Sequence, residues 1–192
     1  MGMQGDKSAP SGRVDIYLYR LDGDYRRKPK EVSQKGRALL AYAVKERYGL
    51  VTGPEDVGLL EKGKPYFPAW PRIHFNISHS GQYVGLALGD LPVGFDIQEK
   101  EQAAFEQMGR HVFSAEEAAA FSRAEDPADF FYRAWVRKEA WIKWSGEGFY
   151  RDIKSLPDEG VTRYLDVEAG YYCALHTEVP VETVLRRIVA LP

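Results

Sequence analysis

Residues 93–98 carry two oxygen-bearing side chains at a spacing that could bind a cation. Side chains alternate along a strand, so Asp96 and Gln98 would share one face of this segment while Phe95 and Ile97 point to the other. Carboxylate and amide oxygens on one face can hold a hard cation. A polar, solvent-facing edge strand fits the same pattern, so this segment alone leaves both interpretations open.

A second candidate lies on a predicted helix over residues 128–145. The spacing puts Lys138, Glu139 and Lys143 on one stripe with the aromatic Trp135. An apolar-looking stripe that is interrupted by charges indicates either a buried site or a simple ion pair. A solvated pair between Glu139 and Lys143, four residues apart, would be worth only about 0.3–0.5 kcal/mol.

Residues 74–81 form the third candidate, because a predicted strand ends there in Ser-His-Ser-Gly. Hydroxyl groups, an imidazole and backbone amides at a turn suit anion binding. Ser78 and His79 do not indicate a hydrolase triad, since neither serine of the segment lies in a Gly-x-Ser-x-Gly elbow and neighbours on a strand point apart. His111 and His176 lack partners at metal-ligand spacing and are interpreted as structural.

The composition limits the possible partners and compartments of this 192-residue chain. Its 26 Lys+Arg and 28 Asp+Glu leave a net charge of −2, which provides no global basic field for nucleic acid or anionic lipid. The one cysteine, Cys173, excludes an internal disulfide and a thiolate-rich zinc site. No run approaches the roughly 18 apolar residues of a membrane span. We therefore expect a soluble, cytoplasmic protein with no nucleic-acid or membrane partner.

Periodicity, caps and turns place these candidates on predicted elements. Period-two alternation predicts strands over residues 14–19, 73–78, 83–88, 93–98, 161–168, 171–176 and 183–190. Apolar stripes and caps predict helices over residues 33–48, 114–121 and 128–145. Glycines and prolines make residues 53–72 a loop with at most short elements. The short turns at residues 80–81 and 89–92 predict that the strands they join are antiparallel neighbours.

The order of these elements indicates an α+β protein. A strand, a helix and three strands are followed again by helices and strands, so we expect two similar, pseudo-twofold α+β lobes. Each lobe would pack a small antiparallel sheet on helices. The expected division is a disordered tail over residues 1–13, an N-terminal lobe over 14–98 and a C-terminal lobe over 99–192.

Four motifs together resemble the signature of the 4'-phosphopantetheinyl transferase superfamily, in its two-lobed, Sfp-type branch. Each is modest alone, but chance would have to supply all four in register. The resemblance covers about residues 33–192 and rests on Gly63-Lys64-Pro65, His74-Phe75-Asn76-Ile77-Ser78-His79-Ser80-Gly81, Val93-Gly94-Phe95-Asp96-Ile97, and Trp135 with Lys138-Glu139-Ala140 and Lys143.

The resemblance implies a monomeric enzyme with its active site at the interface between the lobes. Such an enzyme transfers 4'-phosphopantetheine from coenzyme A to a serine of an apo acyl, polyketide or peptidyl carrier protein. It releases adenosine 3',5'-bisphosphate and depends on Mg²⁺. The carriers would serve fatty-acid, polyketide or nonribosomal-peptide synthesis, and the sequence does not decide among them.

Roles for individual residues also follow from the resemblance. Asp96 and Glu139, with Gln98 beside them, would hold Mg²⁺ against the pyrophosphate of coenzyme A. Glu139 would in addition accept the proton of the incoming serine. Lys143 would pair with the pyrophosphate as a point charge. Asp96, Glu139 and Lys143 are thus the expected catalytic residues.

Other residues match positions that contact the nucleotide phosphates of coenzyme A. Ser78 and His79 match contacts to the 3'-phosphate, while Arg37 and Lys64 match other phosphate contacts. The basic stretch over residues 26–30 aligns poorly with the family and is interpreted as a solvated loop.

The sequence departs from the family pattern in two places. Many members have glutamate where this chain has Gln98, and a neutral amide attracts a cation less, so we expect a weaker metal affinity. The region before the first helix is also shorter than the pattern, which would change the surface that holds the nucleotide. These departures motivate an alternative, a non-catalytic relative that binds coenzyme A or a carrier protein, whereas the presence of Asp96, Glu139 and Lys143 argues against it.

Overall fold

The computed structural model describes residues 12–191, except for residues 24, 26–27, 102–104 and 149–151. The expected tail lies outside the described residues up to residue 11, and so do Arg26 and Arg27 of the basic stretch. The helices are α1 (Pro29–Tyr48), α2 (Phe105–Val112), α3 (Ala115–Phe121) and α4 (Pro127–Ser145), with short 3₁₀ turns at Pro54–Asp56 and Ile153–Ser155. The strands are β1 (Arg13–Arg20), β2 (Gly58–Leu59), β3 (Pro65–Tyr66), β4 (His74–Ser80), β5 (Tyr83–Gly89), β6 (Val93–Glu99), β7 (Val161–Tyr164), β8 (Tyr171–Thr177) and β9 (Glu182–Ile188).

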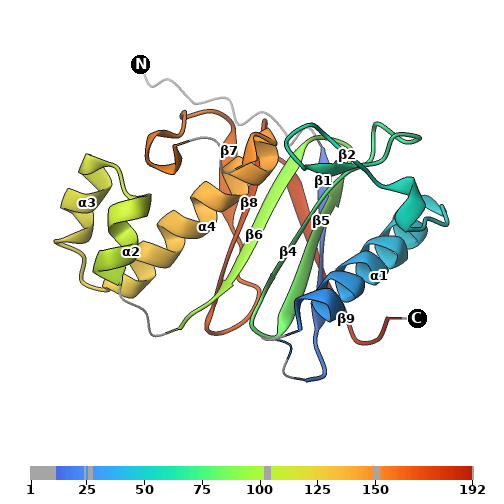
Figure 1. Cartoon of the computed structure of the whole chain (residues 1–192), viewed down its shortest axis with the longest axis horizontal. Coiled ribbons are helices and arrows are strands. Elements are labelled where there is room, and N and C mark those ends of the chain that lie inside the picture. Colours follow the sequence, from blue (N-terminus) through green and yellow to red (C-terminus); the bar gives the residue numbers. More distant parts are fainter. Residues whose placement is uncertain (1–11, 24, 26–27, 102–104, 149–151, 192) are drawn as a thin grey trace, which may run out of the picture.

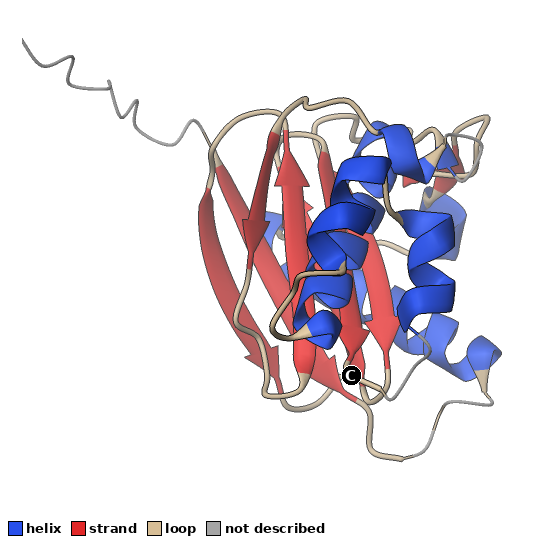
Figure 2. Ribbon diagram, turned by 90° about the vertical axis from the view of Figure 1, so that its left-hand side faces the viewer, coloured by secondary structure: helices blue, strands red, loops and turns tan. Residues whose placement is uncertain are grey.

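Two main sheets with helices packed on them confirm the predicted α+β class (Figure 1). One sheet has the strand order β4-β5-β1-β9, and the other has the order β6-β8-β7. Their pairs are antiparallel, except that β1 and β9 run parallel. Figure 2 shows the strands gathered on one side of the molecule and most of the helical ribbon on the other. None of the described helices is both long and apolar enough to cross a membrane.

Most of the predicted elements are present. All predicted strands begin within two residues of their expected positions, but β7 ends at Tyr164 instead of residue 168. Helix α1 begins four residues earlier than predicted, because Pro29 suits the first turn of a helix. The sequence reading missed α2, which is only eight residues long and buries only Gly109 and Val112. So short a helix gives little periodic signal.

The pairing of β6 differs from the prediction. The short β5–β6 connection predicts antiparallel neighbours, but β6 pairs with β8 in the other sheet, with Phe95 opposite Leu175. The last strand, β9, returns to pair with β1. Sheet pairing therefore crosses the expected lobe boundary at residues 98–99 in both directions. The division into lobes and their pseudo-twofold relation stay predictions.

Three side chains of β4, which we call the polar seam, join the two sheets. Asn76 accepts a hydrogen bond from the backbone N–H of Phe95 at 3.1 Å, and Ser78 and Ser80 accept from those of Ile97 at 3.4 Å and Glu99 at 2.9 Å. Buried backbone N–H groups must find acceptors. The polar seam supplies these acceptors where a paired strand would otherwise provide carbonyls.

The hydrophobic core has separate layers on the two faces of the four-stranded sheet. One layer lies between the sheet and α1 and includes Tyr17 of β1, Leu39 of α1 and Phe67. The other face packs against the three-stranded sheet, where Phe95 and Ile97 lie. Phe95 and Ile97 thus point away from the Asp96 face, as the alternation predicts. The Asp96 face of β6 is left to meet α4.

A buried carboxylate, Asp15 on β1, holds three elements together. It is only 1% exposed. Its oxygens receive hydrogen bonds from Arg47 of α1 at 2.7 Å, from Arg13 at 2.8 Å and from Arg186 of β9 at 3.4 Å. Charge-assisted bonds of this kind are stronger than neutral ones. They tie the last strand and the first long helix to the centre of the sheet.

Candidate functional site

Asp96 lies at the centre of a buried polar cluster between β4, β6 and α4. Its side chain is 1% exposed, which excludes the solvent-facing interpretation of this strand. Lys143 donates to Asp96 Oδ1 from 2.6 Å and Ser78 donates to the same oxygen from 2.7 Å. Gln98 Nε2 donates to Oδ2 from 3.1 Å. Both carboxylate oxygens therefore have donors in this structure.

Glu139 lies beside Asp96 but lacks such donors. It is 5% exposed, and its Oε1 atom has no hydrogen-bond partner among the described residues. Burial raises the pKa of Glu139 to about 7, and the neighbouring charge of Asp96 adds to the rise, while Lys143 opposes it. A buried carboxylate oxygen without a donor is costly unless a ligand or a proton satisfies it. The geometry thus indicates that Glu139 would be stabilised by binding a cation or a proton.

The position of α4 depends on a close contact with β6. The helix begins at Pro127 after an Asp126 cap, and it ends where Gly146 takes a left-handed conformation with φ of 72°. A Cβ atom on Gly94 of β6 would lie 1.9 Å from the Ala140 carbonyl oxygen. Only glycine allows this approach. Helix residues on either side of Ala140, including Glu139 and Lys143, are thereby held against the Asp96 face.

Charged residues of α4 divide between two clusters. Lys143 bonds across to Asp96, so the alternative of a solvated pair between Glu139 and Lys143 is wrong. Lys138 is 2% exposed and faces elsewhere, where its ammonium lies 2.8 Å from both Glu117 Oε2 and the Ile153 carbonyl. Lys138 therefore anchors α3 to α4 and does not belong to the Asp96 cluster.

The donor set fits a Mg²⁺ ion. Two buried carboxylates, Asp96 and Glu139, are near enough that the charge of Asp96 raises the pKa of Glu139, and Mg²⁺ usually takes one or two carboxylates together with phosphate oxygens and waters. In the part of the chain that the structure describes, no group of three or more His, Cys, Asp or Glu side chains is placed to hold a metal. Gln98 directs its nitrogen at Asp96 and its oxygen toward Ser80, 3.5 Å away, so its amide would have to turn over to ligate a cation.

The residues expected to contact phosphates fall in three places. Ser78 is buried in the polar seam, and His79 beside it is exposed, with a pKa lowered by partial desolvation and by Lys143. Lys64 lies at the C-terminal end of α4, where it donates to the Trp144 carbonyl from 2.6 Å, and burial lowers its pKa to about 8. Arg37 lies on the exposed face of α1 and lines a cavity of about 280 Å³. The structure thus brings Ser78 to Asp96, whereas His79 shares only charge interactions with Lys143 and Asp96, and Lys64 and Arg37 lie elsewhere.

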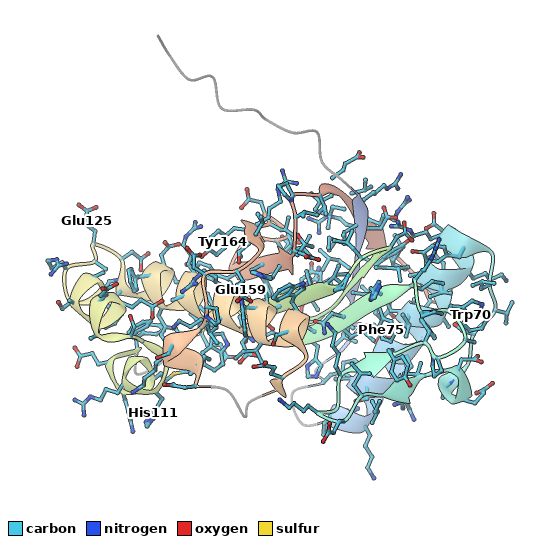
Figure 3. All side chains as sticks on the ribbon, turned by 90° about the horizontal axis from the view of Figure 1, so that it is seen from above. Trp70, Phe75, His111, Glu125, Glu159 and Tyr164 are labelled. Atoms are coloured by element: carbon cyan, nitrogen blue, oxygen red, sulfur yellow. The ribbon has the colours of Figure 1, made fainter. Side chains whose placement is uncertain are left out.

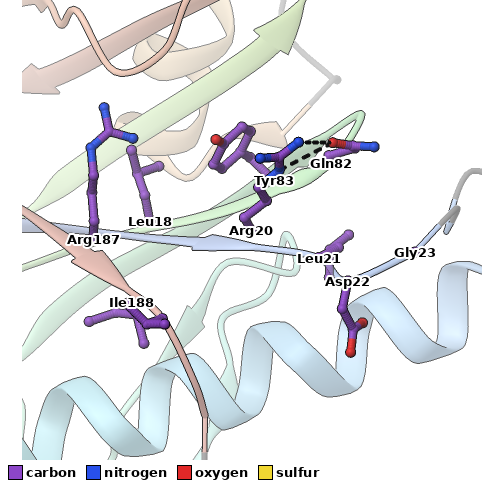
Figure 4. A pocket seen from close by; sticks show the side chains of 10 residues that line it. Leu18, Arg20, Leu21, Asp22, Gly23, Gln82, Tyr83, Arg187 and Ile188 are labelled. Atoms are coloured by element: carbon purple, nitrogen blue, oxygen red, sulfur yellow. Dashed lines mark hydrogen bonds between the residues drawn. The ribbon is translucent and has the colours of Figure 1, made fainter.

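A larger cavity, of about 670 Å³, lies at the ends of β1, β5 and β9 (Figure 4). The described residues that line it include Arg20 and Arg187 and none of the predicted site residues. Both guanidinium groups have partners, because Arg20 donates to Gln82 from 3.0 Å and Arg187 lies 3.4 Å from Glu168. The cavity is therefore separate from the polar cluster around Asp96.

The sequence reading missed the polar seam and the role of Ser78 within it. Asn76, Ser78 and Ser80 alternate with larger residues along β4, so they share one face of an otherwise apolar strand. Polar side chains at every second position of a buried strand could have indicated bonds to a neighbouring element. The Lys143–Ser78 contact of 3.0 Å depends on tertiary packing, and no local sequence pattern predicts it.

Comparisons with known proteins identify the family. Residues 92–180, which include β6 and α4, match the model of the 4'-phosphopantetheinyl transferase superfamily. A 4'-phosphopantetheinyl transferase of Bacillus subtilis is 30% identical over 173 residues, covering 83% of this chain and 77% of the relative. The transferase Sfp of Bacillus subtilis strain 168 is 30% identical over 76% of this chain and 74% of its own length. The transferase AcpT of Salmonella typhimurium is 36% identical over 58% of this chain and 56% of its own length. The chain therefore belongs to the 4'-phosphopantetheinyl transferase superfamily, and it is an enzyme of that class.

Proposed function

We propose that this enzyme transfers the 4'-phosphopantetheine of coenzyme A to a serine hydroxyl of an apo carrier protein. The other product is adenosine 3',5'-bisphosphate. The observation that carries the proposal is the convergence of Asp96, Glu139 and Lys143 in one buried cluster, within the part of the chain that matches the family model. Fatty-acid, polyketide and nonribosomal-peptide carriers are all candidate substrates.

Asp96 and Glu139 would hold the metal, with Gln98 as a weak neutral neighbour. When bound, Mg²⁺ neutralises charge on the pyrophosphate and on the leaving group. The unpartnered Oε1 of Glu139 supports this assignment, because it leaves a buried negative oxygen that a cation would satisfy. Asp96 supports it from strand β6, where its own donors limit the directions in which its carboxylate can turn.

Glu139 is also the residue best suited to accept the serine proton. A pKa raised to about 7 by burial lets its carboxylate accept a proton near neutral pH. Asp96 is less suited, because its oxygens already receive three hydrogen bonds. The proton of the serine hydroxyl would pass to the Glu139 carboxylate, directly or through one water, as the hydroxyl oxygen attacks phosphorus and the bond from that phosphorus to the oxygen of adenosine 3',5'-bisphosphate breaks.

Lys143, His79, Lys64 and Arg37 would contact the phosphates of coenzyme A. Lys143 contacts Asp96 and would act next to the reacting pyrophosphate, and the exposed His79, which senses the charge of Lys143, would contact a phosphate from the next position along β4. Lys64 and Arg37 lie on other elements and would need a ligand that extends over the N-terminal half of the molecule. The Ser78 hydroxyl would reach a phosphate only by giving up its bond to Asp96.

We infer that the enzyme acts as a monomer in the cytoplasm. Its one cysteine, Cys173, is buried in the apolar layer between the sheets, and burial raises the pKa of its thiol. A thiol kept in this form suits a reducing compartment and takes no part in the chemistry. Size-exclusion chromatography with light scattering would measure the mass in solution.

Intact-protein mass spectrometry tests the transfer directly. Several apo carrier proteins are incubated with the enzyme, coenzyme A and Mg²⁺, and the expected result is the gain of one phosphopantetheine unit. The gain should disappear with EDTA and in Glu139→Gln, and it should persist in Glu125→Gln. Glu125 is a suitable control because it is exposed at the outer end of the molecule (Figure 3).

The same experiment separates the proposal from its alternative. No gain on any carrier, combined with tight binding of coenzyme A in calorimetry, would favour a relative that binds the coenzyme without transferring it. Gln98→Glu would then be the first variant to make, because it restores the carboxylate that many members of the family have at this position.

A further inference from the structure

We propose that Lys143 is the resident cation of the ligand-free site, and that a divalent cation binds only when the Lys143 ammonium leaves Asp96. This inference rests on the proposed function, since it takes Asp96 as a metal ligand. It adds a step that the donor set alone does not show, namely the exchange of one cation for another.

The first argument is that the Lys143 ammonium already occupies the position at Asp96 that a metal ion would take. The Lys143 ammonium lies 2.6 Å from Asp96 Oδ1, with Ser78 at the same oxygen and the Gln98 amide at Oδ2. A metal bound at Oδ1 would share this oxygen with an ammonium group in a buried, low-dielectric space. Two cations at that separation repel strongly. A metal at Oδ1 and the Lys143–Asp96 bond would therefore exclude each other.

The second argument is that the Lys143 ammonium has a defined binding position and that its side chain is open to solvent, so that it can leave. Ser78 contacts both partners, 3.0 Å from the ammonium and 2.7 Å from the carboxylate, so the hydroxyl fixes the pair. The side chain of Lys143 is 25% exposed, whereas that of Asp96 is 1% exposed. A flexible four-carbon stem with one end open to solvent can swing out, while the carboxylate stays in place.

The third argument is charge balance. Without a ligand, Lys143 neutralises only one of two neighbouring carboxylates, and Glu139 Oε1 is left without a donor. A divalent cation between Asp96 and Glu139 would neutralise both. The ammonium that it displaces remains on the same helix face, where the pyrophosphate of coenzyme A offers a new anionic partner.

The exchange predicts that the metal and coenzyme A bind cooperatively through Lys143. A coenzyme that draws the ammonium off Asp96 removes the competitor and so raises the metal affinity. By linkage, the metal must raise the affinity for coenzyme A by the same factor. Lys143→Met should abolish most of this coupling, since no ammonium remains to be exchanged.

Proton–nitrogen spectra of lysine ammonium groups in the wild-type protein test the displacement itself. An ammonium held against a buried carboxylate exchanges slowly with water and gives a resolved signal. We expect the Lys143 signal to be present without metal and to be lost as Mg²⁺ saturates the protein. Lys138 provides an internal reference, because its ammonium is buried against Glu117 and Ile153 and should not respond.

Calorimetry of Mg²⁺ binding without coenzyme A tests the competition. Because a charge-assisted hydrogen bond is worth about 1.5–3 kcal/mol, Lys143→Met should bind the metal roughly tenfold or more tightly than the wild type. Lys62→Met removes an equal charge from an exposed position and should leave the affinity unchanged. Asp96→Asn should abolish binding in either background.

The outcomes separate this inference from the proposed function. A Lys143 signal that persists at saturating Mg²⁺, or equal metal affinities for the wild type and Lys143→Met, would overturn the exchange while carrier modification still supports the transferase. A wild type that modifies no carrier would overturn the function, and the exchange with it. The spectra need no variant, so a poorly folded Lys143→Met protein would not prevent a decision.

Discussion

Gly94→Ala should inactivate the enzyme by moving α4 away from β6. The added Cβ would lie 1.9 Å from the Ala140 carbonyl oxygen, 2.4 Å from the Trp144 nitrogen and 2.8 Å from Trp144 Cβ. Two of these neighbours are backbone atoms of the helix, so no side-chain rotation relieves the overlap. The helix must shift by more than about 1 Å to restore ordinary contact.

That shift acts directly on the site. Lys143 is 2.6 Å from Asp96, and an added 1 Å takes the pair beyond hydrogen-bond distance. A misplacement of about 1 Å can cost about 100-fold in rate, so we expect at least that loss in the initial rate of carrier modification. Overpacking should also lower the free energy of unfolding by about 1–3 kcal/mol.

Gly36→Ala is the matched control, because it places the same substitution at a buried position of α1. Its Cβ would have two side chains as its nearest neighbours, with Ile77 at 3.3 Å and Val84 at an ordinary 3.9 Å. Alanine is favoured over glycine within a helix by about 1 kcal/mol, which offsets this tight contact. We expect the initial rate to be unchanged and the stability to stay within about 1 kcal/mol. A Gly94→Ala enzyme that folds and retains the wild-type rate would refute the argument that this contact positions the site.

Three further predictions concern other residues. Gln98→Glu should lower the Mg²⁺ concentration needed for half the maximal rate, and an unchanged value would mean that residue 98 is not a metal neighbour. Asp15→Asn should lower the free energy of unfolding by about 1.5–3 kcal/mol in urea titrations and leave the rate unaltered, since Arg47 loses its charge-assisted bond to buried Asp15 and keeps only Asp90 as a charge partner. Burial lowers the pKa of His176 from 6.5 to about 4 in the folded protein. As the pH falls, the imidazole of the unfolded chain is therefore protonated at a higher pH than that of the folded protein. Stability should therefore fall as the pH drops from about 6.5 toward 4, and His176→Gln should flatten that slope.

Local sequence patterns predicted most of the helices and strands of the fold. The alternation in β1 and β6 and the glycine that ends α4, Gly146, are signals that neighbours in sequence create, and the structure has these elements. The pairing of β6 with β8 was not predictable in this way. The backbone N–H groups on one edge of β6 donate to side chains of β4. The short turn between β5 and β6 therefore does not lead to backbone pairing of these two strands.

The site was predicted in part, for a similar reason. Strand alternation placed Asp96 and Gln98 on one face, and helical spacing placed Glu139 and Lys143 on one stripe. Residue types alone could not show that Lys143 bonds to Asp96 in preference to Glu139, because that choice depends on how α4 lies across β6. The same crossing buried Ser78 against Asp96, although its sequence motif had suggested a contact to phosphate.

The two carboxylates of the site differ in surroundings more than in position. Asp96 receives three hydrogen bonds, one of them from an ammonium, and is fixed by the polar seam. Glu139 has one oxygen without a donor, and burial and the charge of Asp96 both raise its pKa. Paired acidic groups whose environments differ in this way commonly divide the work of charge and proton transfer. On our proposals, such a site would assign the serine proton to Glu139, and Asp96 would bind a cation, first the ammonium of Lys143 and then the metal.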